Sequence, residues 1–273
     1  MKIATWAAGL LCATLAQANE WHAYYRLTSD AYQAKFDEMV DQGYRLNSVS
    51  GYERDGQPNF AVIFEKRETT AWWSHSGMTS DVYQQKFDKY LKQGYRVVQV
   101  DGYTVDETAY YAAIWDKSPS GAWMTRHGMT ADSAQEYFDE YLSQGYRMTD
   151  ISGYEVACAE RFAAIWEKTS TGCEWQAYAN MTSAEYQSRF DQYVAEGYRL
   201  VDVDGYQADG VVYYAAIWDK SPSGAWVARH GMDSPTFQAE FDKYKQKGYV
   251  LRTLSGYNAG GEDRYAAIWV KPT

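Results

Sequence analysis

The chain has few of the side chains that enzymes use most often for chemistry. Among its 273 residues there are 4 histidines and 3 cysteines, and the histidines at positions 22, 75, 127 and 230 lack the local spacing of a metal site. The Ser-x-x-Lys, Gly-x-Ser-x-Gly and His-Glu-x-x-His motifs are absent, as are the glycine-rich phosphate- and dinucleotide-binding motifs. We therefore predict no catalytic residue, no metal and no cofactor. This favours a non-catalytic role and leaves enzymatic activity undecided.

A surplus of positive charge is also missing. The 26 Lys and Arg residues are outnumbered by 36 Asp and Glu residues, which gives a formal net charge of −10. An acidic surface repels phosphate groups, so the composition argues against nucleic acid or an anionic membrane as a partner.

Long apolar runs are missing too, apart from one at the start of the chain. Lys2, the apolar run from Ile3 to Leu15 and the small-residue site Ala16-Gln17-Ala18 have the pattern of a secretory signal peptide. The run is too short to span a bilayer. We predict that residues 1–18 are a signal peptide and that residues 19–273 form one repeat domain. The protein is then secreted, or periplasmic in a Gram-negative host.

Two cysteines, Cys158 and Cys173, remain after the predicted signal peptide. Secretion permits a disulfide, but the two residues are expected at opposite ends of one strand. At about 3.3 Å per residue they lie roughly 25 Å apart, whereas a bridge needs Cα atoms within about 7 Å, so we do not expect the bond. Asn180-Met181-Thr182 is a glycosylation sequon, which has meaning in a eukaryotic host.

Repetition is what the chain has in abundance. Gly-Tyr pairs begin at Gly43, Gly94, Gly145, Gly197 and Gly248, in steps of 51, 51, 52 and 51 residues. A fixed period of this size indicates a repeat architecture. The predicted units are residues 20–68, 69–117, 118–168, 169–220 and 221–273.

Each unit has four parts, which are clearest in the fourth unit. A strand that opens on Trp175 (the Trp strand) precedes a helix with the capping box Thr182/Glu185, and the helix ends at Gly197. A second strand, 198–206, ends in a Gly-Tyr pair (the Gly strand). The last strand, 214–220, contains an unbroken apolar run, which is typical of a strand covered on both faces (the Ala strand). The sequence thus predicts an α/β (α+β) repeat protein of five strand-helix-strand-strand units.

The phase of the repeat suggests how the units join. Segments 118–121 and 221–224 read Ser-Pro-Ser-Gly, a turn composition, so we expect each Ala strand to pair antiparallel with the next Trp strand. The first Trp strand and the last Ala strand are then left without partners. Pairing of Trp21–Tyr25 with Tyr265–Trp269 would close the units into a propeller-like ring and remove both open edges. An open curved solenoid is the alternative.

The strand directions predict a functional face. Trp and Gly strands are expected to run parallel, and ligands of such units tend to lie beyond the carboxyl ends of the parallel strands. At this rim, Arg126-His127 and Arg229-His230 are expected to face Asp101 and Asp204. Salt bridges between neighbouring units explain these residues as well as a binding surface does. The candidate ligand-binding residues are Tyr24, His75, Arg126, His127, Tyr178, Arg229, His230, Asp101 and Asp204.

Two recurring phrases carry a resemblance to a known family. Gly-Tyr-Arg-x-x-x-Val-x-Gly-Tyr, as in 197–206, and Tyr-Ala-Ala-Ile-Trp-Asp-Lys, as in 214–220, resemble the bacterial tandem repeat domain family. These repeats are similar to the N-terminal region of fungal polyglycine hydrolases, secreted proteases that attack glycine-rich linkers of plant chitinases. The resemblance implies that a β-lactamase-like domain does the chemistry in those enzymes. That domain has no counterpart in this sequence, so no catalytic residue is carried over.

The function expected from the sequence is therefore a secreted, non-catalytic repeat module that binds an extracellular protein or carbohydrate. One alternative is a secreted hydrolase, or an accessory subunit of a separate catalytic chain similar to the polyglycine-hydrolase serine proteases. A purely structural envelope or matrix component is the third possibility.

Overall fold

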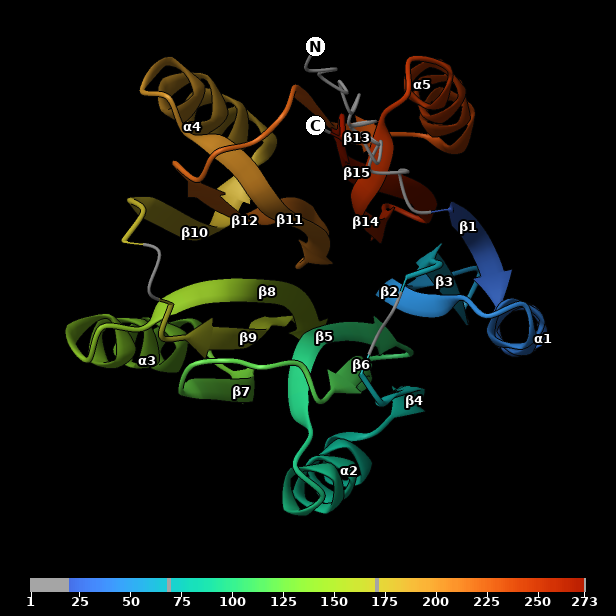
Figure 1. Cartoon of the computed structure of the whole chain (residues 1–273), viewed down its shortest axis with the longest axis horizontal. Helices are drawn as coiled ribbons and strands as arrows, with labels where there is room; N and C mark the ends of the chain where they lie inside the picture. The colour runs from blue at the N-terminus through green and yellow to red at the C-terminus, as the bar shows by residue number, and fades with distance from the viewer. Residues whose placement is uncertain (1–19, 68–69, 170–171, 273) are drawn as a thin grey trace, which may run out of the picture.

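The computed structural model describes residues 20–67, 70–169 and 172–272. Within these residues the chain forms five units, each with one helix and one three-stranded sheet. The units stand around a common axis with their helices on the outside (Figure 1). The predicted strand-helix-strand-strand order is confirmed, whereas the predicted signal peptide lies outside the described residues.

The elements recur with nearly constant length. The Trp strands are β1 (Trp21–Thr28), β4 (Trp72–Met78), β7 (Trp123–Met129), β10 (Trp175–Thr182) and β13 (Trp226–Met232). The helices are α1 (Ser29–Asp41), α2 (Ser80–Lys92), α3 (Ala131–Ser143), α4 (Ser183–Ala195) and α5 (Ser234–Gln246). The Gly strands are β2 (Arg45–Arg54), β5 (Arg96–Val105), β8 (Arg147–Val156), β11 (Arg199–Ala208) and β14 (Val250–Ala259). The Ala strands are β3 (Gln57–Glu65), β6 (Thr108–Asp116), β9 (Ala159–Glu167), β12 (Val211–Asp219) and β15 (Glu262–Val270).

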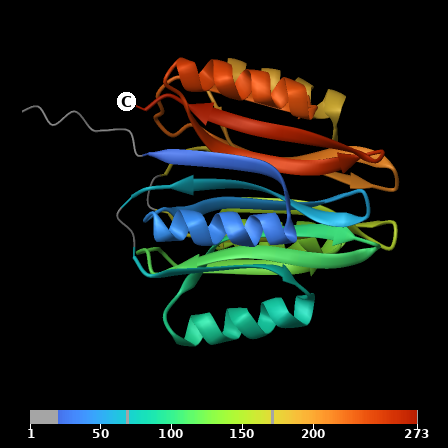
Figure 2. The same ribbon diagram turned by 90° about the vertical axis from the view of Figure 1, so that its right-hand side faces the viewer.

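The Ala strand is central in every sheet. The Trp strand pairs antiparallel with one of its edges and the Gly strand with the other, as in the β10-β12-β11 sheet. Trp and Gly strands therefore run parallel around the helix, as predicted. The strands run between two end faces, which the side view in Figure 2 shows. We call the end that carries the Gly–Ala hairpins the upper face.

The predicted pairing between units is wrong. The Ala strand already has a partner on each edge within its own unit, so it has no free edge for the next Trp strand. In particular, β1 pairs with β3, and β15 pairs with β13 and β14. Pairing of Trp21–Tyr25 with Tyr265–Trp269 therefore does not occur, and neighbouring units meet through the faces of their sheets.

The helix boundaries follow from local chemistry. Each helix begins after a residue whose side chain accepts a backbone N–H of the first turn: Thr28, Thr79, Thr130, Thr182 and Asp233. The predicted capping box of Thr182 and Glu185 is present. Just beyond α4, Gly197 has a φ of 84°, a conformation that costs glycine little. Sequence-local signals therefore account for where the helices start and stop.

The core consists of five buried clusters, each shared by two neighbouring units. In the cluster between units one and two, for example, Tyr32 and Val62 of unit one lie with Ile114 of unit two. The repeated helix phenylalanine contacts the first tryptophan of the next unit in every case: Phe36–Trp72, Phe87–Trp123, Phe138–Trp175, Phe190–Trp226 and Phe241–Trp21. The last unit thus makes with the first unit the contacts that join the other neighbours.

A glycine-on-tyrosine contact explains the Gly-Tyr pair at the end of each Gly strand. The ring of Tyr103 lies against Gly51 of the preceding unit, so closely that a Cβ atom on Gly51 would lie 2.4 Å from it. Only glycine leaves room for this approach. The contact recurs at Gly102–Tyr154, Gly153–Tyr206, Gly205–Tyr257 and Gly256–Tyr52.

Candidate functional site

The Gly strands are the innermost strands, and a cavity of about 400 Å³ opens on the axis where they end. We call this cavity the central mouth. It is lined by the Gly-Tyr pairs just described, so that five tyrosines converge on it: Tyr52, Tyr103, Tyr154, Tyr206 and Tyr257. The residue after each tyrosine also lines it, namely Glu53, Thr104, Glu155, Gln207 and Asn258. The mouth therefore lies on the upper face, where the sequence predicted the functional surface.

The tyrosine hydroxyls point away from the mouth and hold the structure. Each accepts a hydrogen bond from the backbone N–H of a bulge residue in its own Trp strand, and this residue has a positive φ. Tyr154, for example, accepts from Gly128 at 2.9 Å and also shares a hydrogen bond of 2.7 Å with Tyr111 of the preceding unit. The rings are thereby fixed in place, which pre-forms the mouth.

Polar side chains at the axis replace the backbone pairing that the inner strands lack. In each junction the N–H of the Gly-Tyr glycine donates to a Ser or Asp side chain of the next unit. The five bonds are Gly51–Asp101 at 2.7 Å, Gly102–Ser152 at 3.0 Å, Gly153–Asp204 at 2.8 Å, Gly205–Ser255 at 3.0 Å and Gly256–Ser50 at 3.1 Å. An unpaired N–H at a buried strand edge would be costly, so this position has a structural role in all five units.

A second layer of polar residues lies below the first. Gln99, Asp150 and Asp202 accept the backbone N–H groups of Val49, Val100 and Ile151 respectively. Between the two layers is a cavity of about 20 Å³, roughly the space of one water molecule.

Burial brings four axial carboxyl groups to unusual pKa values. It raises the pKa of Asp202 and of Asp204 to about 7. Burial, followed by the charge of Asp204, raises the pKa of Asp101 well above its usual range, and burial together with the charge of Asp202 does the same for Asp150. The axis therefore holds protons at neutral pH that ordinary aspartates would have lost.

Five of the predicted site residues lie on the outer strands instead of at the mouth. Tyr24, His75, Arg126, Tyr178 and Arg229 share one position of the Trp strand, and each contacts the helix of its own unit. His75 Nε2 lies 2.6 Å from the hydroxyl of Tyr90, and the hydroxyl of Tyr193 donates to that of Tyr178 at 2.7 Å. Burial, followed by the charges of Lys86 and Lys89, lowers the pKa of His75 to about 4.

His127 and His230 occupy the next position and insert into the junction with the preceding unit. The Nε2 atom of His127 lies 3.0 Å from Ser80 Oγ, and that of His230 lies 3.1 Å from Ser183 Oγ. Burial lowers the pKa of both histidines. The environment is an aromatic pocket, in which His127 packs against Tyr83.

The expected pairing of Arg126-His127 and Arg229-His230 with Asp101 and Asp204 is therefore wrong. The aspartates lie on innermost strands and the basic residues on outermost strands, with an Ala strand between them. Of the nine predicted residues, Asp101 and Asp204 line the central mouth. The five tyrosines of the mouth were missed, although the Gly-Tyr pair that recurs at the end of each Gly strand was a signal that could have identified them.

The remaining sequence features have plain positions in the structure. Cys158 is exposed and Cys173 is partly buried, and no disulfide joins them. Asn180 is the positive-φ residue of β10, and its backbone N–H donates to Tyr206. In the described ranges, no three or more His, Cys, Asp or Glu side chains are arranged to hold a metal ion. The helices in those ranges are also too short or too polar to cross a membrane.

A family model described as "Polyglycine hydrolase-like, structural repeat" matches the chain five times. The matched residues are 18–67, 69–118, 120–169, 172–221 and 223–272. The chain belongs to this family. Each match contains one strand-helix-strand-strand unit, so the polyglycine hydrolase-like repeat is the unit whose Gly-Tyr pairs build the central mouth. The resemblance found in the sequence is confirmed.

Proposed function

We propose that this repeat protein is a secreted, non-catalytic module that binds an extracellular protein or glycan at the central mouth. The observation that carries the proposal is that five equivalent Gly-Tyr pairs line one cavity of about 400 Å³ on one end face. Concave sites with fixed aromatic walls and a few polar groups are the usual form of a binding site. The hydroxyls of these tyrosines are engaged by backbone N–H groups of the Trp strands, which holds the walls of the cavity in place.

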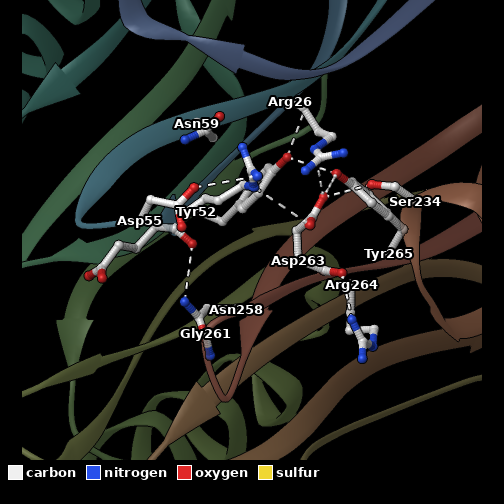
Figure 3. Close-up of polar contacts among 12 residues, drawn as sticks. Arg26, Tyr52, Asp55, Asn59, Ser234, Asn258, Gly261, Asp263, Arg264 and Tyr265 are labelled. Carbon is white, nitrogen blue, oxygen red and sulfur yellow. Dashed lines mark hydrogen bonds and ion pairs between the residues drawn. The ribbon is translucent and has the colours of Figure 1, made fainter.

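The proposal includes a closed ring of five units, with the open solenoid as the alternative. Support comes from the junction between the last and first units, where the Asp263 carboxylate accepts hydrogen bonds from Tyr265 at 2.6 Å and Ser234 at 2.7 Å and lies 3.2 Å from Arg26 Nε (Figure 3). Asn258 Nδ2 also donates to the carbonyl of Glu53 at 3.3 Å. A ring leaves no end unit to be capped, and it completes the wall of the mouth.

Secretion is part of the same proposal and is supported by Lys2, the apolar run after it and the small residues at 16–18. In a Gram-negative host the periplasm is the corresponding location. The formal charge of −10 supports an extracellular protein or carbohydrate as the partner, and it disfavours nucleic acid and anionic membranes.

A binding screen with a charge-reversal variant tests the site. Glu155 lies at the mouth, and Glu136 is exposed on α3 at the periphery. We expect Glu155→Lys to weaken by at least tenfold a protein or glycan interaction found with the unaltered protein, and Glu136→Lys to leave it unchanged. Equal binding by both variants would remove the mouth from the proposal.

The second candidate function is that of an accessory subunit for a separate catalytic chain, or of a hydrolase in its own right. Membership of a family described as polyglycine hydrolase-like is the observation that favours it. The purified protein should be incubated with glycine-rich peptides alone and together with a polyglycine-hydrolase-like serine protease. Cleavage by the protein alone would refute the non-catalytic proposal, whereas stimulation of the protease would support the accessory role.

A further inference from the structure

We propose that the central mouth binds a primary ammonium group, carried by a lysine side chain or by a chain amino terminus, with Asp101 as its principal counter-ion. The inference rests on the proposed function, because it names the ligand chemistry of the same mouth. It adds a charge, a hydrogen-bonding pattern and a proton balance to the general proposal of binding.

The charge of the mouth has one sign. Its described lining includes four acidic residues, Glu53, Asp101, Glu155 and Asp204, and contains no lysine, arginine or histidine. Five tyrosine rings complete the wall. The tyrosines are only 2–3% exposed and their rings pack against glycines of the neighbouring units. The carboxyl groups are therefore the part of the wall that selects a ligand by charge, and they favour a cation.

Asp101 supplies an acceptor that points to a ligand. Its side chain is 5% exposed and lines both the mouth and the small cavity beneath it. The Oδ2 atom accepts the N–H of Gly51 at 2.7 Å, while Oδ1 receives no hydrogen bond from the residues that the structure describes. This oxygen is not sealed off in the protein interior, so a donor that enters through the mouth can reach it.

The contacts of Asp101 and Asp204, the two aspartates that line the mouth, select ammonium over guanidinium. Asp204 is already occupied at both oxygens, since Oδ2 accepts from Gly153 at 2.8 Å and Oδ1 accepts from Ser255 Oγ at 2.8 Å. Asp101 has a single free oxygen. A guanidinium gains its advantage from bidentate pairing with both oxygens of one carboxylate, which neither residue can offer. A compact ammonium needs one strong acceptor and can turn its other donors elsewhere.

Binding should release a proton. Asp101 is surrounded by other carboxyl groups, Asp204 and Asp202 from β11 and Asp150 from β8, with the N–H of Gly51 from β2 as its donor. Burial, followed by the charge of Asp204, raises the pKa of Asp101 well above its usual range. An ammonium ion that binds takes the place of the proton on the fraction of this carboxyl group that is still protonated, and that proton passes to the buffer.

The test is calorimetric titration of the unaltered protein with small probes at pH 7.5. Nα-acetyl-lysine N-methylamide presents the side-chain ammonium, and glycylglycinamide presents the amino terminus. The controls are Nα,Nε-diacetyl-lysine N-methylamide, which has no ammonium group, and Nα-acetyl-arginine N-methylamide. We expect one or both ammonium probes to bind at least tenfold more tightly than either control, and their relative affinity tells which source fits. Binding should tighten from pH 5.5 to pH 7.5, and the apparent enthalpy should change with the ionisation enthalpy of the buffer.

Matched variants assign the effect to Asp101. Asp101→Asn keeps an acceptor for Gly51 and removes the charge, and we expect it to weaken ammonium binding at least tenfold. Asp139→Asn, on the outside of α3 where the side chain accepts from Gln135, should have no effect. If Asp101→Asn does not fold, the lysine probe and its acetylated form still decide the matter on the unaltered protein, because equal affinity for the two contradicts recognition of an ammonium group.

Two outcomes would overturn the inference, and both can be told apart from a failure of the proposed function. Equal affinity for the lysine probe and its acetylated form would show that charge is not recognised. Absence of probe binding, in a protein whose macromolecular interaction is still weakened by Glu155→Lys, would refute ammonium recognition while leaving the mouth as the binding site. If Glu155→Lys weakened neither probe binding nor the macromolecular interaction, the proposed function itself would be contradicted.

Discussion

Adding one methyl group to a glycine of the Gly-Tyr pairs that end the Gly strands tests how the units are joined. A Cβ atom on Gly102 would lie 2.4 Å from the ring of Tyr154, and one on Gly256 would lie 2.5 Å from the ring of Tyr52. Neither ring can yield cheaply, because the hydroxyl of Tyr154 is bonded to Gly128 and Tyr111, and that of Tyr52 is bonded to Arg26 and Tyr265. Both substitutions to alanine must therefore push a fixed ring out of a buried junction.

The expected cost can be estimated from these contacts. Forcing an extra methyl group into a well-packed site costs about 1–3 kcal/mol, and each hydrogen bond lost when the ring moves adds about 1 kcal/mol. We expect Gly102→Ala and Gly256→Ala to lower the free energy of unfolding by about 2–4 kcal/mol each. Gly43→Ala is the control: its φ is 83° but no atom lies within 4 Å of the added methyl group, so backbone strain of about 1 kcal/mol is the whole effect.

Urea unfolding, followed by tryptophan fluorescence, measures the three variants under one condition. The comparison of Gly256→Ala with Gly102→Ala is decisive, because Gly256 meets the first unit and Gly102 meets the next unit in sequence. If Gly256→Ala costs no more than Gly43→Ala while Gly102→Ala costs the full amount, the last and first units are not packed together in solution, and the reasoning is refuted.

Three further predictions concern charge. Asp202 has a folded-state pKa of about 7 against about 3.9 in the unfolded chain, so its contribution to stability is lost as pH rises through this window. Asp202→Asn should therefore be more stable than the unaltered protein at pH 8 but not at pH 4. Urea titrations at both pH values measure the difference. Burial lowers the pKa of His127, so stability falls as pH drops below about 6.5, and His127→Ala should make the melting temperature less dependent on pH between 7.5 and 5.5. Arg147 Nη2 lies 2.9 Å from Asp219 Oδ2 across a junction, and Arg147→Ala should cost about 1–3 kcal/mol in urea unfolding, because a largely buried carboxylate loses one of its partners; no loss would mean that Arg199, 3.1 Å away, satisfies Asp219 by itself.

The elements of each unit could be predicted because the signals are local. The Thr182/Glu185 capping box, the glycine at 197 and the apolar run of 214–218 each depend on neighbours a few residues away. The same local signals recur at a fixed period, which made the unit count and boundaries readable. Strand directions followed from the order of elements.

Sheet pairing could not be predicted because it depends on which edges remain free. The Ser-Pro-Ser-Gly segment at 221–224 suits a hairpin, but it also suits a connection that carries the chain from one sheet to the next. The sequence does not state that the central Ala strand is already paired on both edges. The error in pairing then placed the Arg-His pairs of the outer strands opposite Asp101 and Asp204 of the inner strands.

The candidate site could be predicted from the sequence only in part, for a related reason. Asp101 and Asp204 stood out because the equivalent residue is serine in the other units, and they do line the mouth. The tyrosines did not stand out because tandem duplication copies every residue of the unit, whatever its role. Only their approach to the glycines of the neighbouring units, which is a tertiary contact, shows that they converge on the axis.

Amide hydrogen exchange at Gly256 tests most directly the central claim, that five units close around one axis and so form a single mouth. The N–H of Gly256 donates to Ser50 Oγ of the first unit at 3.1 Å, and that of Gly102 donates to Ser152 Oγ at 3.0 Å within the chain of units. The account predicts protection of Gly256 to the same degree as Gly102, within about one order of magnitude in exchange rate. Rapid exchange at Gly256 beside strong protection at Gly102 would contradict it and favour an open solenoid.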